Sequence, residues 1–133
     1  MSIDRAGVAR WLAAYVEAWK SYDPEAIGAL FSDDCVYRYH PADQPLRGRE
    51  AIVTSWIEDD PDEPGSFEGA YEPIAVDGDV AVATGSSTYS KAPGGPIDSI
   101  YDNCFVLRFD DEGRCRKFTE WYVKRPEEGV GTN

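Results

Sequence analysis

Histidine and cysteine are scarce in this sequence, which limits the metal and disulfide chemistry open to it. It has one histidine, His40, and three cysteines, at positions 35, 104 and 115. Three widely spaced cysteines without a C-x-x-C pair predict neither a disulfide framework nor a zinc site. A single histidine excludes a histidine-rich metal centre, although a carboxylate site for magnesium or calcium needs none. We therefore predict no metal site.

Basic residues and long apolar runs are also few. The 13 lysines and arginines are outnumbered by 25 aspartates and glutamates, which gives a formal net charge of -12. Because binding to nucleic acid or anionic lipid draws on clustered basic side chains, we expect neither partner. No apolar run approaches the length of a membrane span, and Asp4 and Arg5 stand where a secretory signal would be apolar. These absences predict a cytoplasmic protein.

The composition that remains is that of one globular domain. The chain has 133 residues, of which 42% are hydrophobic and 13% aromatic, which is enough to bury a core. We place a single domain over residues 1–125. Residues 126–133, PEEGVGTN, have nothing to bury, so we expect them to form a flexible tail.

Three segments of the first half are predicted to be helices. Residues 3–22 carry apolar side chains at helical spacing, with polar side chains on the opposite face. Asp23 followed by Pro24 is typical of a helix start, and this second helix is expected to end at residues 32–34. Residues 49–58 form a third amphipathic pattern.

The second half is predicted to be mostly strands. Residues 35–39 form a short strand, and residues 67–76, 80–90, 98–109 and 114–124 form four long antiparallel ones, with Pro73 marking an edge or a bulge. The order of elements predicts an α+β fold with the helices on one face of a curved, mainly antiparallel sheet.

Two further segments leave alternatives open. The row Ala81, Ala83, Gly85 and Ser87 alternates along one strand, so either a helix packs closely there or space is left open. The segment EDDPDEPG, residues 58–65, has five carboxylates in six positions. Its two prolines and its lack of ordered ligand spacing favour a solvated loop over a cation site.

The last hairpin, residues 98–124, organises the predicted site. If its loop has an even number of residues, Phe109 pairs with Arg114. The other pairs on the same face follow by moving two residues at a time away from the loop along both strands. These pairs are Phe105 with Phe118, Asn103 with Glu120, and Tyr101 with Tyr122. They share the more apolar face of the hairpin, which should look inward.

Glu120 is thereby predicted to lie among aromatic rings. Burial there disfavours the charged carboxylate and raises its pKa, which suits a general acid or base near neutral pH. A purely structural carboxylate, hydrogen-bonded to Asn103 or a tyrosine, is the alternative. The prediction depends on the register, because a one-residue bulge after Asp110 would put Trp121 inside and Glu120 in water.

Aromatic and polar residues around this face complete the candidate site. Tyr15 would donate a hydrogen bond to a substrate oxygen, with plain helix-to-sheet packing as its alternative. His40 titrates near neutral pH, but a loop histidine is often solvent-exposed. The other candidate ligand-binding residues are Trp19, Tyr37, Tyr39, Trp56, Ser87, Tyr101, Asn103, Phe105, Phe118 and Tyr122.

Three segments resemble the nuclear transport factor 2-like superfamily, which includes SnoaL-like proteins and ketosteroid isomerase. They are AYVEAWKSYDPEAIGALFSDD, PLRGREAI and YDNCFVLRFDDEGRCRKFTEWY. The resemblance covers residues 8–124 and implies a cone of curved sheet closed by three N-terminal helices around a pocket. The fold hosts isomerases, dehydratases, cyclases, epoxide hydrolases and proteins without catalysis, so function has to come from the pocket residues.

The resemblance to ketosteroid isomerase implies a role for one residue. Tyr15 matches the tyrosine that donates to the oxyanion in that family. The family's aspartate base falls on Tyr39, and its protonated aspartate falls on Phe105. The tyrosine donor is therefore kept while both carboxyl groups are replaced.

The resemblance to limonene epoxide hydrolase implies a role for Glu120. It matches the carboxylate that activates water, and Tyr37 matches the neighbouring tyrosine. The family's arginine and second aspartate fall on Gly85 and Ser87. Both comparisons place position 120 inside the cone, in agreement with the hairpin register.

These observations predict a SnoaL-like enzyme that moves a proton without a cofactor. Its ligand would be a small hydrophobic, oxygenated molecule, undergoing isomerisation, dehydration, cyclisation or hydration. Glu120 would be the acid or base, and Tyr15, Tyr37 and Asn103 would hold the substrate oxygen. A non-catalytic ligand-binding or dimerisation module is the alternative. A homodimer is expected from the apolar residues of the outer sheet face, Ile100, Cys104, Val106, Trp121 and Val123.

Overall fold

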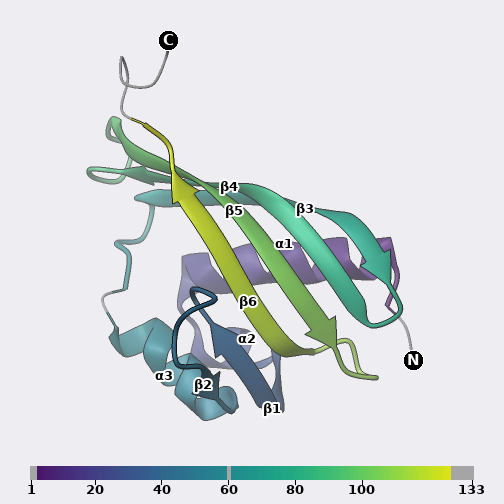
Figure 1. Ribbon diagram of the computed structural model, residues 1–133. Coiled ribbons are helices and arrows are strands. Elements are labelled where there is room, and N and C mark those ends of the chain that lie inside the picture. The colour runs from purple at the N-terminus through teal and green to yellow at the C-terminus, as the bar shows by residue number, and fades with distance from the viewer. Residues whose placement is uncertain (1–2, 60, 127–133) are drawn as a thin grey trace.

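The computed structural model describes residues 3–59 and 61–126 (Figure 1). The helices are α1 (Arg5–Ser21), α2 (Pro24–Gly28) and α3 (Arg49–Glu58). The strands are β1 (Phe31–Arg38), β2 (Leu46–Arg47), β3 (Phe67–Asp77), β4 (Val80–Ser90), β5 (Ile97–Phe109) and β6 (Cys115–Lys124). The predicted tail lies outside the described residues, apart from Pro126.

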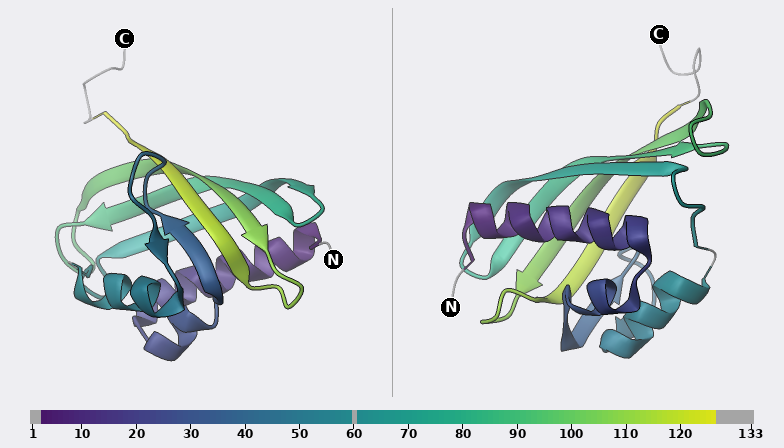
Figure 2. Two further views of the ribbon diagram at one scale, coloured as in Figure 1. Left: turned by 60° about the horizontal axis from the view of Figure 1, so that its bottom comes forward. Right: turned by 180° about the vertical axis from the view of Figure 1, so that it is seen from behind.

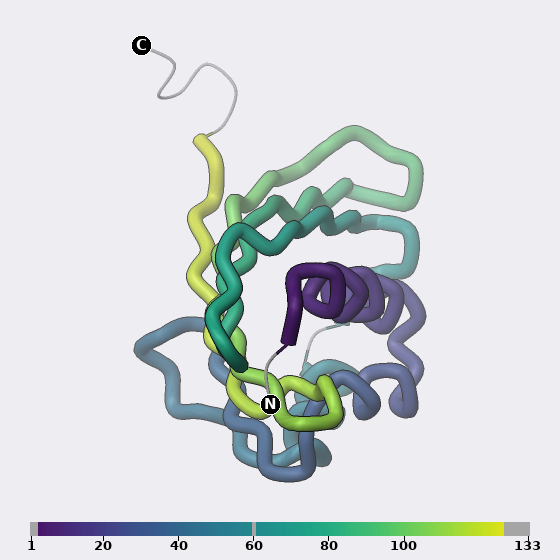
Figure 3. The backbone as a smooth tube through the Cα atoms, turned by 90° about the vertical axis from the view of Figure 1, so that its right-hand side faces the viewer, coloured from purple at the N-terminus to yellow at the C-terminus, as the bar shows by residue number. Residues whose placement is uncertain are grey.

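The strands form one six-stranded sheet in the order β2-β1-β6-β5-β4-β3. All neighbours are antiparallel except β1 and β6, which run parallel. Figure 2 shows the helices on one side of this sheet, and Figure 3 shows the sheet curling around α1. The predicted α+β class and the mainly antiparallel curved sheet are therefore confirmed, although α2 has only 5 residues.

Helix α1 lies on the concave side of the sheet, as its apolar stripe predicts. Asp4 caps its first turn by accepting from the Gly7 amide, and Tyr22 ends it with a left-handed backbone conformation. The buried side chains of the helix are Val8, Trp11, Leu12, Tyr15, Ala18 and Trp19. The stripe places two aromatic side chains, Tyr15 and Trp19, one turn apart over the sheet.

The second helix is shorter than predicted, because the chain already pairs with the sheet at Phe31. The carbonyl of Leu30 accepts hydrogen bonds from the Cys115 amide and the Trp11 indole, and Phe31 pairs with Cys115. From Phe31 to Val36, β1 advances five residues while β6 advances two, from Cys115 to Lys117. Residues 32–34, expected to end a helix, instead occupy this irregular part of β1.

The register of the β5–β6 hairpin differs from the predicted one by two residues. Leu107 rather than Phe105 pairs with Phe118, and Phe105 rather than Asn103 pairs with Glu120. A shift of two residues leaves every side chain on its face, because side chains alternate with a period of two. The predicted partners were therefore wrong, and the predicted inward face was right.

Two irregularities of one residue each account for this shift. The loop 110–114 has an odd number of residues, so Phe109 pairs with Cys115, and Gly113 takes the positive φ of 78° that the loop requires. A bulge then moves the pairing by one more residue, so Arg108 pairs with Lys117. Either step alone would turn Glu120 outward, whereas both together return it to the concave face.

The small-residue row of β4 leaves room for a tyrosine of the neighbouring strand. Tyr71 of β3 pairs with Gly85, and a Cβ atom on Gly85 would lie 2.0 Å from the Ala70 carbonyl oxygen and 2.7 Å from Cδ1 of Tyr71. The Tyr71 ring thus lies across the glycine and is held beside the pocket. Pro73 lies in β3, which is an edge strand with a register shift between Pro73 and Ala75, as predicted.

The outer face of the sheet carries the apolar residues expected at a dimer interface. Trp121 is 44% exposed and Val123 is 70% exposed, while Ile100, Cys104 and Val106 are half-buried. The homodimer stays a prediction. Within the described residues, none of the helices combines the length and apolar character needed to cross a membrane.

Replacing Gly85 with alanine should destabilise the protein, because the new Cβ would collide with the backbone of β3. Overpacking of this kind costs roughly 1–3 kcal/mol, and urea denaturation would measure the loss. Gly28→Ala is the matched control: its Cβ would meet the side chains of Arg49, at 3.4 Å, and Val53, at 3.8 Å, and its stability should stay within about 1 kcal/mol of wild type. Equal stability of the two variants would contradict the close approach at Gly85.

Candidate functional site

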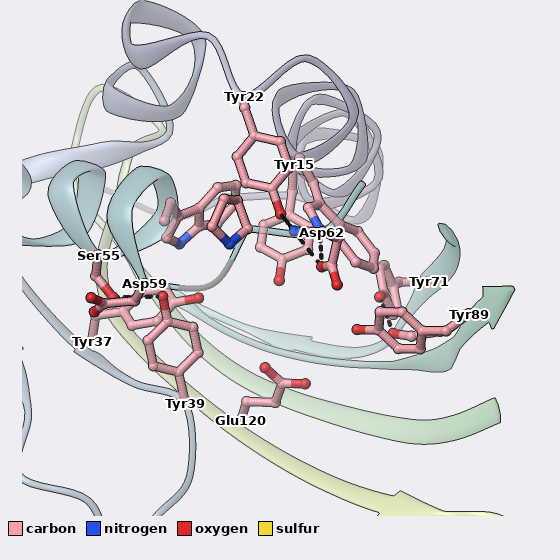
Figure 4. Close-up of a pocket in the computed structure, with 14 residues that line it drawn as sticks. Tyr15, Tyr22, Tyr37, Tyr39, Ser55, Asp59, Asp62, Tyr71, Tyr89 and Glu120 are labelled. Atoms are coloured by element: carbon pink, nitrogen blue, oxygen red, sulfur yellow. Dashed lines mark hydrogen bonds between the residues drawn. The ribbon is translucent and has the colours of Figure 1, made fainter. Parts of the chain in front are cut away.

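An inner cavity of about 310 Å³ lies between α1, α3 and the concave face of the sheet. Figure 4 shows its lining, which is dominated by aromatic rings. The lining residues are Tyr15, Trp19, Tyr22, Tyr37, Tyr39, Ser55, Trp56, Asp59, Pro61, Asp62, Tyr71, Ser87, Tyr89 and Glu120. The volume is at the lower end of the range for small-molecule pockets.

An outer hollow adjoins the inner cavity. Its lining includes Tyr101, Asn103 and Tyr122 from β5 and β6, together with Asp98. Four residues line both spaces, and we call this group the junction: Tyr39, Asp62, Tyr89 and Glu120. The two spaces therefore meet at two carboxylates and two tyrosines.

Glu120 is the last member of a hydrogen-bond chain that crosses four strands diagonally. The Tyr71 hydroxyl of β3 bonds the Ser87 hydroxyl of β4, which donates to Asn103 Oδ1 of β5 at 2.9 Å. Asn103 Nδ2 then donates to Glu120 Oε2 of β6 at 2.7 Å. Because Ser87 gives its proton to Asn103, Tyr71 must donate to Ser87, and the amide of Asn103 is fixed with its nitrogen toward Glu120.

The position of Glu120 raises its pKa to about 7. Burial is the larger cause, and the hydrogen bond from Asn103 acts in the opposite direction by stabilising the charged form. Asn103 holds Oε2, while Oε1 has no hydrogen-bond partner among the described residues. Figure 4 shows the carboxyl group pointing into the cavity. It can therefore give or take a proton there at neutral pH.

The tyrosines around Glu120 stay neutral. Burial raises the pKa of Tyr15 and that of Tyr37 well above the ordinary value, and the Glu120 carboxylate adds to both shifts. The Tyr37 ring packs against the Tyr39 ring with centroids 4.8 Å apart, and its hydroxyl lies near the Tyr15 hydroxyl and the Trp56 indole. That indole nitrogen is buried and lacks a partner of acceptable hydrogen-bond geometry among the described residues. These hydroxyl groups are suited to donate hydrogen bonds to a ligand.

Phenylalanines lie beneath the tyrosines and fix their positions. Phe118 stacks on Tyr37 with ring centroids 4.3 Å apart, and Phe105 packs against Tyr71 at 4.8 Å. Both phenylalanines are 0% exposed. The predicted aromatic floor is thus a solid layer, and tyrosines are the most numerous residues in the cavity lining above it.

Asp62 is anchored at the cavity wall by α1 and its C-terminal cap. Its Oδ2 accepts hydrogen bonds from Trp19 Nε1 at 3.1 Å and from the Tyr22 hydroxyl at 3.4 Å. Its backbone amide donates to the Tyr22 hydroxyl at 2.9 Å. Asp59 also lines the cavity. The acidic segment 58–65, predicted to be a solvated loop, therefore contributes two carboxylates to the site.

The structure brings most of the predicted site residues together. The inner cavity is lined by Tyr15, Trp19, Tyr37, Tyr39, Trp56, Ser87 and Glu120. The outer hollow includes Tyr101, Asn103 and Tyr122. Phe105 and Phe118 lie beneath the lining, and His40 is exposed beside the Tyr122 ring, outside both spaces.

Several lining residues were missed by sequence reasoning, among them Asp62, Tyr71 and Tyr89. Tyr89 follows Ser87 by two positions on the same strand, so the alternation of strand residues could have found it. Asp62 lies in a loop, where no periodicity reveals its direction.

Charge at the site is entirely of one sign. Within the described residues, neither space is lined by a lysine, arginine or histidine. The same part of the chain has no group of three His, Cys, Asp or Glu residues arranged to hold a metal ion.

The raised pKa of Glu120 predicts a pH-dependent gain in stability for Glu120→Gln. The folded-state pKa, about 7, lies above the ordinary value of 4.5. The free energy of unfolding of the wild type therefore falls as the pH rises from 4.5 to about 7. Above that range the ionisation of Glu120 lowers it no further. The glutamine cannot ionise, so its advantage in free energy of unfolding should grow by roughly 1–3 kcal/mol between pH 4.5 and pH 8.

Urea denaturation of both proteins at each pH would measure this change, because the other carboxylates are common to the two and cancel in the difference. A difference that stays constant across the window would show that Glu120 ionises normally.

Comparisons with solved structures show a shared fold. An LEH-like epoxide hydrolase from M. tuberculosis has 19% identity and a TM-score of 0.64, over 90% of this chain and 84% of its own. A candidate ketosteroid isomerase from Kribbella flavida has 17% identity and a TM-score of 0.66, over 96% and 86%. A nuclear transport factor 2-like protein of unknown function from Mesorhizobium loti has 24% identity and a TM-score of 0.61, over 92% and 97%.

Comparison by sequence gives the family. A search of curated proteins found no significant match. A family profile described as the SnoaL-like domain matches residues 12–118, which is most of the chain. The three structural neighbours have the same cone of curved sheet and helices. The chain therefore belongs to the SnoaL-like domain family of the nuclear transport factor 2-like superfamily.

Proposed function

We propose that this protein is a cofactor-independent enzyme that transfers a proton within a small, hydrophobic, oxygenated ligand. The reaction class is isomerisation, dehydration, cyclisation or hydration, all of which need a positioned acid or base. Family membership alone does not carry this proposal, because the fold hosts several activities and also proteins without one. The proposal is supported by the chemistry of the inner cavity.

The observation that carries the proposal is the state of the Glu120 carboxyl group. One oxygen is held at 2.7 Å by Asn103, the other faces the cavity, and burial raises the pKa to about 7. A carboxyl group with this pKa is present in both protonation states at neutral pH. It can therefore remove a proton from a ligand as the carboxylate and return it to another atom as the acid.

The tyrosine hydroxyls would supply the second element of the reaction. Removing a proton next to a carbonyl, or opening an epoxide, builds negative charge on the ligand oxygen. Tyr15 and Tyr37 are buried, neutral and directed at the cavity, so they can donate hydrogen bonds to that oxygen (Figure 4). Trp19 and Trp56 provide apolar walls.

A reaction that needs only a buried base tests this proposal without knowledge of the natural substrate. With 5-nitrobenzisoxazole, the Glu120 carboxylate would take the ring C3 proton, the N–O bond would break, and the electron pair would leave on the phenolate oxygen as the nitrile forms. We expect the protein to accelerate this elimination, with a rate that rises through about pH 7 as the base ionises. The coloured phenolate product gives the measurement.

Two variants control this experiment. Glu120→Gln should lose the acceleration while keeping its fold, as judged by circular dichroism. Glu72→Gln changes the charge equally at an exposed position of β3 and should keep the activity. An acceleration that persists in Glu120→Gln would contradict the assignment of Glu120 as the base.

The alternative of a non-catalytic binding module gives a different result in a thermal-shift screen. The screen would contain steroids, terpenoid epoxides and aromatic polyketides, because binding to the folded state raises the melting temperature. We expect at least one stabilising compound to be converted by the wild type and returned unchanged by Glu120→Gln. Stabilising ligands that the wild type also returns unchanged would favour the binding module.

A further inference from the structure

The charge of the pocket says more about its ligand than hydrophobicity does. Asp59, Asp62 and Glu120 line the inner cavity, and Asp98 lines the outer hollow. No basic side chain among the described residues lines either space to neutralise these groups. The formal net charge of -12 for the whole chain adds to the negative potential. An anionic ligand would be repelled, and a cationic one would be attracted.

The aromatic lining suits one kind of cation in particular. Six tyrosines and two tryptophans line the inner cavity. The negative faces of aromatic rings attract ammonium groups, which keep little of their hydration in such a cage. A hydrated metal ion would instead need several converging oxygen ligands, and the described residues contain no group of three or more His, Cys, Asp or Glu side chains that could hold one.

The junction brings these two features to one place. Asp62 and Glu120 are its carboxylates, and Tyr39 and Tyr89 are its rings. Burial raises the pKa of the Tyr89 hydroxyl, and the negative charge of Asp62 raises it further. Asp62 is held through Oδ2 by Trp19 and Tyr22, which leaves its other oxygen available. Figure 4 shows Asp62 and Glu120 facing the same space from opposite sides.

We infer that the ligand carries an ammonium group, either a protonated or a quaternary amine, which binds at the junction between Asp62 and Glu120. This inference rests on the proposed function, since it places the charged end of the same substrate beside the reacting carboxyl group. A cation next to Glu120 favours its ionised form, which is the form that removes a proton. The oxygenated part of the ligand then extends toward Tyr15 and Tyr37.

A pair of probes with the same shape and different charge tests the inference. In 3-hydroxyphenyltrimethylammonium and 3-tert-butylphenol, a trimethylammonium group replaces a tert-butyl group on the same phenol. Titration calorimetry at pH 7, where both phenols are mostly protonated and Glu120 is partly ionised, gives the two affinities. We expect the ammonium probe to bind at least about tenfold more tightly.

Asp62→Asn identifies the site of the charge preference. Asparagine keeps an oxygen to accept from Trp19, so the loop should hold its position. The variant should bind the ammonium probe about fivefold or more weakly and the neutral probe within about twofold of wild type. Glu72→Gln, which removes an equal charge from an exposed site on β3, should leave both affinities unchanged.

The outcomes separate this inference from the proposed function. If the neutral probe binds as tightly as the ammonium probe, the inference is overturned while the pocket remains a ligand site. If neither binds, the inference is overturned, and the benzisoxazole reaction still decides the role of Glu120. Equal weakening by Asp62→Asn and Glu72→Gln would also overturn it, because the preference would then come from net charge alone.

Discussion

The hydrogen bond from Asn103 to Glu120 is the interaction on which the site depends. A half-buried carboxyl group with no partner would be displaced toward solvent or would stay protonated well above neutral pH. Asn103 offsets part of that cost and fixes one oxygen, which leaves the other facing the cavity. Asn103 can do this because Ser87 and Tyr71 fix its amide orientation. The geometry of one carboxyl group is thus set by four adjacent strands.

The aromatic core determines the shape of the cavity around this group. Trp11, Phe31 and Phe118 fill the space beneath it, with ring centroids 6.0–6.4 Å apart. The tyrosines lie on top of this layer, with their rings packed and their hydroxyls toward the cavity. Gly85 lets the Tyr71 ring reach this layer from the edge strand. The same tyrosines give the cavity an apolar surface, hydrogen-bond donors and aromatic faces of the kind that attract cations.

Much of this arrangement could be predicted from the sequence, namely the elements whose structure is determined by a local residue pattern. The periodicity of α1 predicted its buried stripe, and the bounds of α3 and β4 agree with their patterns. The end of α2 could not be predicted, because the pairing of Phe31 with Cys115 links distant parts of the chain. The hairpin partners were wrong by two residues, yet Glu120 kept its face because the two irregularities cancel. Asp62 was missed because its direction depends on contacts with Trp19 and Tyr22.

The ionisation of Glu120 is the central claim, and it can be measured directly. In protein labelled with ¹³C at glutamate side chains, the carboxyl shift of each glutamate is followed by NMR as the pH changes, and the missing signal in Glu120→Gln assigns the residue. The structure predicts a midpoint of about 7 for Glu120, with a further increase in Asn103→Ala, where the stabilising hydrogen bond is lost. A midpoint near the ordinary 4.5, unchanged by loss of Asn103, would contradict the account.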